Sequence, residues 1–467
     1  MTQNNASLLS NKIDGFLEKT ALITELVAYL RERNFQFGRG VLIFGVQHIM
    51  QQTVILCWAL KQLGIPYTHI ALCGKVYSNN ADSICMLRDL GVKVPRPRKY
   101  KFSSAHGGEQ IQDLRLLAQR FAERKKAMVD PVVIVLDDGG HALANARRML
   151  TEPYRMVGVE QTASGFWQPG IRGVEFPIVD VGASAVKRLC EPPLIVDAAL
   201  HRVAKYVGPS FAGQRCGVLG LGYIGRRLAQ QLLEMGAVLS VYDVRTNAYA
   251  DLQEYRAQCI HDVVNSSNII FGCSGKDVTK DLQDEIGKKG LTSAHRTFFS
   301  MSSGDDEFYS LKQEILSKLQ TGKQYFTIDT IPDISASVWN SDFTIVRNGF
   351  PVNFDNSGQS VPLQLIQGTV CALIVAICQA FNITLRNLAT RRNLRVMLDG
   401  GFQTWLVDHW NQHTQGRIRS LMGHESSKMA SHTFVRQASV DRTDPLAVDI
   451  GPTFDDANVF WSAQIRQ

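Results

Sequence analysis

The sequence predicts an α/β protein built from two domains with parallel sheets. Apolar runs alternate with amphipathic helical segments along most of the chain, which favours parallel strands joined by helices. A glycine-rich turn follows one of these runs near residue 220, and a length of 467 residues exceeds the usual size of one domain. Hydrophobic residues make up 45% of the chain and charged residues 20%, which is typical of a soluble globular protein.

The first half of the chain alternates helices and strands. Residues 8–35 have helical apolar spacing, and Val41–Gly45 has the composition of a buried strand. Gly64-Ile65-Pro66 ends the helix that follows. In order, the remaining helices are expected at 51–63, 81–90, 110–127 and 195–206, and the remaining strands at 67–72, 92–94, 131–136, 156–160 and 177–181.

The strand at 131–136 runs directly into Asp137-Asp138-Gly139-Gly140-His141. In open α/β sheets, ligands bind at the carboxyl ends of the strands, so this acidic and histidine-containing loop is a candidate functional site. The alternative is a turn with a helix cap, for which Asp is well suited. Further on, Lys187 and Glu191 lie four residues apart, a spacing that would also form a simple surface ion pair on any helix.

The glycine-rich turn predicts a Rossmann-like dinucleotide-binding unit. Gly220, Gly222 and Gly225 have the G-x-G-x-x-G spacing between an apolar strand and an amphipathic helix, and Asp243 ends the next strand. An acid at this place accepts hydrogen bonds from a ribose diol and repels a 2′-phosphate, so NAD is favoured over NADP. Arg245 weakens that preference slightly. The alternative is a parallel α/β turn that binds nothing.

The second half continues the alternation. A helix is expected at 248–256, strands at 268–271 and 297–301, short strands at 325–328 and 344–347, and a strongly apolar helix at 362–382. The loops Gly272–Gly275 and Ser302–Asp305 would line the cofactor crevice, which includes Ser274 among the expected cofactor residues. The tail from about residue 411 is polar, and Val459–Trp461 could dock on a neighbouring subunit.

Several classes of protein are disfavoured by the sequence. The net charge is +7, but the basic clusters carry no interleaved aromatic residues, so no nucleic acid is expected. The longest apolar run, Val370–Cys378, is too short to span a bilayer, and the first residues do not form a secretory signal. The nine cysteines form no C-x-x-C pair, which indicates free thiols in the cytoplasm. We find no familiar metal-binding spacing and expect no metal.

The order of the segments resembles a known family. The blocks are GVQHIMQQTVIL (45–56), CGKVYSNN (73–80), VIVLDDGGHAL (133–143), GVEQTASG (158–165), PIVDVGASAVKRLCE (177–191) and GVLGLGYIG (217–225). Over roughly residues 40–375 the chain resembles the S-adenosylhomocysteine hydrolases. In that family a tightly bound NAD oxidises the ribose 3′-hydroxyl, the acidified C4′ proton is removed, the thiol is eliminated, water adds, and the ketone is reduced again.

The resemblance implies a domain arrangement and an assembly. A substrate domain is expected over residues 1–205, completed by about 356–410, with an NAD-binding Rossmann domain over 206–355 and a C-terminal tail over 411–467. It also implies a role near one-carbon metabolism and a homo-oligomer, a dimer or tetramer.

The resemblance also assigns roles to residues. Lys187, with Glu191 in place of an aspartate partner, falls near the 3′-hydroxyl, and His48 falls near C5′. The expected catalytic residues are Lys187, Glu191, His48 and His141, and the expected substrate-binding residues are Ser78, Asn80, Gln161 and Gln52. The expected cofactor-binding residues are Gly220, Gly222, Tyr223, Ile224, Gly225, Asp243, Thr162, Ser164, Ser274 and Asn353.

The chain also departs from the family at positions near the reacting sugar. His141 replaces an aspartate, Gln161 a glutamate and Ser303 a histidine. Gln161 keeps hydrogen-bonding ability but cannot take a proton at neutral pH, whereas His141 can titrate. Further replacements are Met50 and Gln52 around the adenine, Val196 near the nicotinamide, and the lack of the family's C-terminal lysine and tyrosine.

Three functions fit the sequence. The first is an NAD-dependent hydrolase or lyase of altered specificity that acts on a nucleoside or sugar-like substrate. The second is a pseudoenzyme that binds NAD and has a regulatory or assembly role. An ordinary hydroxyacid dehydrogenase ranks last, because those chains usually place the glycine-rich turn earlier. Retention of Lys187 with an acidic partner favours the first over the second.

Overall fold

The computed structural model describes residues 3–96, 99–101, 106–125, 128, 130–150, 154–319, 325–327, 330–385, 395–417 and 447–448. The chain divides into two compact units. The first unit comprises Met1–Arg96, Gln110–Glu191 and Val361–Gln467, and the second comprises Pro97–Glu109 and Pro192–Ser360. The sequence had suggested residue 206 as the start of the second domain. In the structure the second unit resumes at Pro192, so it includes most of the helix that precedes the glycine turn.

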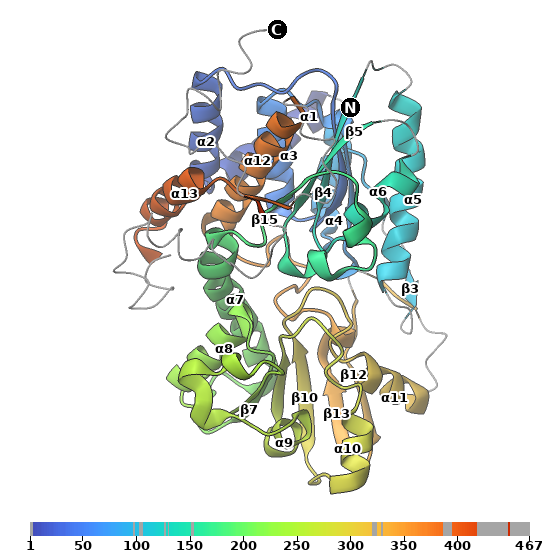
Figure 1. The fold of residues 1–467 in the computed structure, drawn as a ribbon, viewed down its shortest axis with the longest axis vertical. Helices are drawn as coiled ribbons and strands as arrows, with labels where there is room; N and C mark the ends of the chain where they lie inside the picture. Colours follow the sequence, from blue (N-terminus) through green and yellow to red (C-terminus); the bar gives the residue numbers. More distant parts are fainter. Residues whose placement is uncertain are drawn as a thin grey trace. The chain divides into compact units, whose positions relative to one another are not determined.

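The first unit contains a parallel seven-stranded sheet (Figure 1). Its central strands are buried along their whole length, as expected for a parallel sheet covered on both faces. In spatial order the strands are β15 (Ala447–Val448), β14 (Arg395–Met397), β6 (Ile178–Asp180), β5 (Arg155–Glu160), β4 (Val132–Asp137), β1 (Val41–Gln47) and β2 (Ile70–Gly74).

Helices cover both faces of this sheet. Apolar side chains of α5 (His106–Lys125) and α6 (His141–Met149) share one buried cluster with side chains of β1 and β4. The opposite face is covered by α12 (Leu363–Leu385), which packs on β4, β5 and α3 (Figure 1). The other helices of this unit are α1 (Gln3–Leu17), α2 (Ala21–Glu32), α3 (Gln51–Gln62), α4 (Ala81–Leu90) and α13 (Gly400–His413). Helix α7 (Glu191–Val207) belongs to the second unit except for its first residue.

Helix α12 is apolar enough and long enough to cross a membrane by composition alone. In the structure, 94% of its most apolar 18-residue window is buried within the protein. Its hydrophobicity is explained by its position, because a helix surrounded by protein on all sides presents apolar side chains all round. It is the one such helix among the described residues.

The second unit contains a six-stranded sheet, parallel except for the edge strand β12. In spatial order its strands are β12 (Ile334–Val338), β13 (Ser341–Ile345), β10 (His295–Ser300), β9 (Ile269–Gly272), β7 (Arg215–Leu219) and β8 (Val238–Tyr242). Its helices include α8 (Tyr223–Glu234), α9 (Ile260–Ser266), α10 (Leu282–Lys289) and α11 (Tyr309–Leu319), and a small ribbon pairs β3 (Tyr100–Lys101) with β11 (Tyr325–Phe326).

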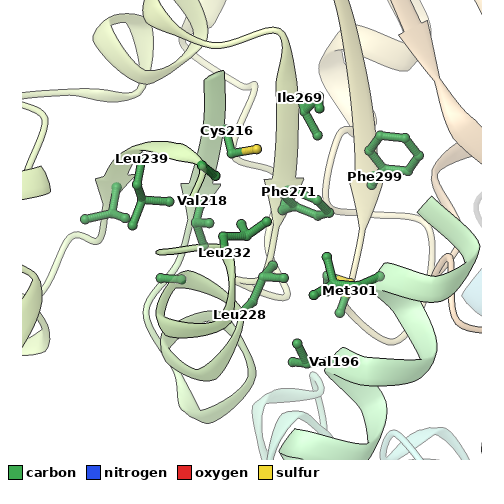
Figure 2. Packing of buried hydrophobic residues seen from close by; sticks show 14 of the residues in the cluster. Val196, Cys216, Val218, Leu228, Leu232, Leu239, Ile269, Phe271, Phe299 and Met301 are labelled. Atoms are coloured by element: carbon green, nitrogen blue, oxygen red, sulfur yellow. The ribbon is translucent and has the colours of Figure 1, made fainter. Parts of the chain in front are cut away.

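In the core of the second unit, the helix after the glycine turn packs against the sheet. Figure 2 shows Leu228 and Leu232 of α8 directed at Val218 and Phe271 of the sheet, with Val196 of α7 nearby. All five side chains are buried. This packing fixes the helix against the strand before the turn, so the turn's backbone is held by the core.

The predicted fold class is confirmed, with several local corrections. The helix expected over 8–35 is two helices, α1 and α2, and the helix expected over 248–256 is a pair of 3-10 segments at Thr246–Ala248 and Ala250–Tyr255. The strand expected at 92–94 is a single bridge at Lys93. The segment Val459–Trp461 and most of the predicted tail lie outside the described residues.

Candidate functional site

The charged and polar side chains of the first unit gather at the carboxyl ends of its strands. His48 follows β1, Lys75 follows β2, and Asp138 follows β4. Each of these positions comes immediately after a buried parallel strand, and the ends of adjacent parallel strands lie at the same edge of the sheet. The structure therefore brings together groups that are up to 90 residues apart in sequence.

Asp138 is the centre of a buried ionic network. Its carboxylate contacts His48 Nε2 at 3.1 Å and accepts a hydrogen bond from Lys75 Nζ. The other ring nitrogen of the histidine, His48 Nδ1, lies 2.6 Å from Ser78 Oγ. Burial alone would raise the pKa of Asp138, but the charges of Lys75 and His48 outweigh it and hold the pKa well below its usual value. Asp138 is therefore a permanent carboxylate that orients the histidine.

Burial instead favours the protonated form of the neighbouring acids Asp137 and Glu160. Burial raises the pKa of Asp137 to about 7, although its carboxylate accepts backbone N–H groups from Asp138 and Leu143. Burial, and then the charge of Asp137, raise the pKa of Glu160 well above its usual value. One oxygen of Glu160 accepts hydrogen bonds from Gly139 N, Thr162 N and Thr162 Oγ1 at 2.7–3.0 Å. Two neighbouring carboxyl groups that are buried together cannot both lose their protons readily.

His141 and Gln161 lie beside this acidic pair. His141 is the first residue of α6, and burial together with the nearby charge of Lys75 lowers its pKa to about 4. It is therefore a neutral imidazole at physiological pH. Gln161 is 7% exposed, and its backbone N–H donates to Asp137 O, while its side-chain oxygen has no hydrogen-bond partner within the part of the chain that the structure describes.

Lys187 and Glu191 form an ion pair in the first unit. Lys187 Nζ lies 2.6 Å from Glu191 Oε1, and Thr369 Oγ1 donates to the other carboxylate oxygen at 2.9 Å. Both side chains are mostly buried, with exposed fractions of 11% and 13%, so the pair is not an ordinary solvated surface pair. Lys187 lies in a π-helical turn, Val186–Cys190, a rare conformation that occurs often at functional sites.

Other predicted residues have visible structural roles. Asn80 caps α4 by accepting a hydrogen bond from Ser83 N at 2.9 Å, and Thr162 holds Glu160 and Gly165. Ser164 Oγ donates to Thr162 Oγ1 at 3.3 Å. Gln52 Nε2 contacts Met50 Sδ at 3.9 Å. The binding roles of these residues stay predictions.

The glycine turn of the second unit has the space that a pyrophosphate requires. A Cβ atom on Gly225 would lie 1.9 Å from Gly220 O, and one on Gly220 would lie 2.8 Å from Ser274 N, so these two positions allow close packing of the backbone. A Cβ on Gly222 would meet nothing within 4 Å. Gly222 is the residue before α8, where backbone N–H groups and the helix dipole favour an anion. The exposed Tyr223 and the half-buried Ile224 begin the helix.

Asp243 is fixed at the end of β8 by several hydrogen bonds. Its carboxylate accepts from Leu221 N at 2.6 Å and from the backbone and side chain of Arg245 at 2.8–3.0 Å. Tyr249 Oη bonds the backbone of Asp243. Although burial acts to raise it, these hydrogen bonds lower the pKa of Asp243, so the group is an anion suited to a ribose diol. The residues present fit NAD.

Glu307 supports the loop beside the turn and was not predicted. It is buried, and its two carboxylate oxygens accept from Ser274 N and Gly275 N, both at 2.7 Å. Burial raises the pKa of Glu307 to about 7. Asn353 is also buried and follows Val352, whose N–H donates to Ser300 O at the end of β10. Lys75 was likewise missed, although its position directly after a strand was a usable signal.

Comparison with known proteins supports the cofactor assignment. Residues 195–292 match the family model described as the NAD-binding domain of D-isomer specific 2-hydroxyacid dehydrogenases. This segment contains the glycine turn and Asp243. The second unit is an NAD-binding domain of the dehydrogenase type, and the cofactor is NAD.

Comparisons of longer segments give more distant similarities. An uncharacterized protein of Mycobacterium tuberculosis is 26% identical over 330 residues, which cover 70% of this chain and 61% of that relative. This chain thus matches about three fifths of the relative's length. The adenosylhomocysteinase of Thermoplasma volcanium is 25% identical over 326 residues, 65% of this chain and 73% of the relative. These similarities support an NAD-binding, dehydrogenase-like family.

Among solved structures, the NAD-bound 3-phosphoglycerate dehydrogenase of Entamoeba histolytica matches with 12% identity and a TM-score of 0.35. The match covers 74% of this chain and 96% of that one.

Proposed function

We propose that the protein is an NAD-dependent enzyme that transiently oxidises an alcohol of a nucleoside-like or sugar-like substrate and then acts at a neighbouring carbon, as an altered relative of the adenosylhomocysteinases. The observation that carries the proposal is the buried network in which Asp138 orients His48 and neutralises Lys75. Burying a lysine and a carboxylate is costly, so a network of this kind at the carboxyl edge of a sheet favours a role in chemistry.

The residues of the first unit divide the proton transfers between them. NAD bound by the second unit would supply a hydride acceptor and later return the hydride. Lys187, held by Glu191, would hydrogen-bond the substrate hydroxyl and hold its proton during oxidation. His48 would move a proton at the neighbouring carbon or at the leaving group, because one of its ring nitrogens contacts a fixed carboxylate and the other the Ser78 hydroxyl.

Several buried polar atoms support a substrate rich in hydroxyl groups, which both donate and accept hydrogen bonds. Within the described part of the chain, Gln52 Oε1, Gln161 Oε1 and Glu160 Oε2 are buried without a hydrogen-bond partner. Each unsatisfied buried group costs about 1–3 kcal/mol, and a bound polyol or nucleoside could satisfy it. Gln52 and Gln161 replace acids of the family, so the preferred substrate need not be adenosine or S-adenosylhomocysteine.

The test is reduction of enzyme-bound NAD. Purified protein is mixed with S-adenosylhomocysteine, adenosine, other nucleosides and free sugars, and absorbance of the reduced nicotinamide is followed in a single turnover. A productive substrate should reduce the cofactor in the native protein and at least ~100-fold more slowly in Lys187→Met, as expected for loss of an acid–base group. Lys61→Met, which changes an exposed lysine of α3, serves as the matched control.

Two results would oppose the proposal. Full activity in Lys187→Met would remove this lysine from the reaction. Bound NAD that no compound of these classes reduces would instead favour an NAD-binding pseudoenzyme with a regulatory or assembly role.

A further inference from the structure

A second cluster of polar side chains lies in the NAD-binding unit. Cys259, His261 and Asp262 surround the start of α9, and their ligand atoms all lie within 4.8 Å of one another. None of these residues is part of the glycine turn or of the network around Asp138. We propose that they form a binding site for a zinc-class divalent cation with three protein ligands.

The hydrogen bonding of His261 determines which nitrogen is available. His261 Nε2 lies 2.7 Å from Gly290 O, and because a carbonyl oxygen can only accept, Nε2 carries the proton. In the neutral ring, Nδ1 then has a free lone pair. A backbone carbonyl that fixes the tautomer of a histidine in this way is the usual outer partner of a metal-ligating imidazole.

That lone pair is directed at another acceptor. His261 is 4% exposed, and its Nδ1 has no hydrogen-bond partner among the described residues. It lies 3.5 Å from Asp262 Oδ1. Two acceptors at this distance repel each other unless a cation or an extra proton lies between them. The separation suits two ligands of one tetrahedral ion, since bonds of about 2.0–2.3 Å place ligand atoms roughly 3–4 Å apart.

The local charges also indicate a cation. Lys289 Nζ lies 3.2 Å from Cys259 Sγ and 3.9 Å from Asp262 Oδ1, so an ammonium group approaches the same ligand atoms. Glu285 contributes a further negative charge and accepts from His261 N at 3.3 Å. Lys289 is on α10 and half exposed, with a flexible side chain, so it can leave when a metal ion enters.

The chemistry of the three ligands selects the metal. A thiolate, an imidazole and a carboxylate suit zinc or cobalt(II) and disfavour magnesium and calcium, which take oxygen ligands. Binding would convert the Cys259 thiol to a thiolate and release one proton. With three protein ligands, the fourth position would be taken by water. The site would fix the start of α9 and stabilise the folded NAD-binding unit.

Cobalt(II) provides a spectroscopic test on the full-length protein. Titration with cobalt should produce a near-ultraviolet sulfur-to-cobalt charge-transfer band and the visible bands of a tetrahedral ion, and zinc should displace both. Cys259→Ser should abolish the charge-transfer band, whereas Cys85→Ser, which removes an exposed thiol on α4, should keep it. Asp262→Asn should weaken zinc binding about tenfold or more.

Lys289→Met separates a metal site from a simple ion pair. Removing the competing ammonium should tighten zinc binding and enlarge the zinc-induced rise in melting temperature. Circular dichroism spectra first establish that each variant is folded, and only folded variants enter the titration. A charge-transfer band missing from both the native protein and folded Lys289→Met would overturn the proposal, as would a band that survives in Cys259→Ser.

Discussion

At the scale of single residues, the acids around β4 and β5 have different ionisation although all are buried. Asp138 is a fixed anion because its contacts with Lys75 and His48 outweigh burial, whereas burial dominates at Asp137 and Glu160. A carboxyl group that keeps its proton can donate a hydrogen bond as well as accept one. The pair Asp137–Glu160 is thus suited to holding a proton close to the charged network.

His141 gives a prediction about stability and pH. Burial lowers its pKa to about 4 from an ordinary value of about 6.5, so between these values the unfolded chain binds a proton that the folded protein does not. The free energy of unfolding therefore falls by up to roughly 3 kcal/mol as the pH falls through this window. We expect His141→Asn to flatten the dependence between pH 6.5 and 4, as measured by urea unfolding.

The control is His201→Asn, an exposed histidine on α7, which should follow the native curve. Asp137 also affects the pH dependence of stability, in the opposite direction to His141. It is present in all three proteins, so the difference between their curves reports His141. The raised pKa of Asp137 makes stability fall as pH rises from about 4 to about 7. A His141→Asn variant with the native pH dependence would contradict the assigned pKa of about 4.

At the scale of elements, different substitutions in the β7–α8 turn should affect NAD binding and folding stability separately. Gly222→Val places a side chain in open space at a backbone conformation that any residue adopts, φ −70°, so the fold should remain intact while the pyrophosphate is obstructed. Gly225→Ala forces a Cβ to within 1.9 Å of Gly220 O and should destabilise the protein by about 1–3 kcal/mol. Thermal unfolding and NAD titration distinguish the two effects.

Gly173→Val is a suitable control, since a Cβ there also meets nothing within 4 Å but lies in the first unit. It should leave both NAD affinity and stability close to native. If Gly222→Val bound NAD normally, the cofactor's phosphates would not pass this glycine.

The end of β8 gives a prediction about cofactor choice. Asp243→Ala removes the ribose acceptor and frees the Arg245 guanidinium, which is 58% exposed and pairs with Asp243 in the native protein. NAD affinity should fall on the order of tenfold, about 1.4 kcal/mol, and affinity for NADP relative to NAD should rise. Calorimetric titration with both cofactors measures this. The control Asp251→Ala breaks an exposed pair with Arg226, and unchanged NAD content in Asp243→Ala would refute the ribose role.

At the scale of the whole molecule, two units have separate hydrophobic cores. A domain with its own core can unfold cooperatively by itself, and a ligand stabilises the unit that binds it by about 2.7 kcal/mol at 100 times its dissociation constant. Scanning calorimetry should therefore show two transitions, of which NAD raises one. Gly222→Val should abolish that shift. A single transition that moves as a whole would show that the units unfold together.

The sequence by itself determined the elements and the cofactor. Strand, turn and helix signals around residues 216–243 are local, and the glycine spacing predicts them because each glycine meets a requirement of its own immediate backbone. The alternation of strands and helices also determined the α/β class and the edge of the sheet where the candidate site residues collect. The two helical misassignments, at 8–35 and 248–256, arose because apolar spacing continues through turns.

Only the tertiary structure decided which groups meet. Lys75 and Asp138 are 63 residues apart, Glu307 and Ser274 are 33 apart, and Lys289 and Cys259 are 30 apart. No local pattern marks these pairs, because each depends on the order in which parallel strands and helices assemble. The same assembly removes water from Asp137, Glu160 and His141. This desolvation raises the pKa of the two acids and lowers the pKa of the histidine, so all three favour their neutral forms.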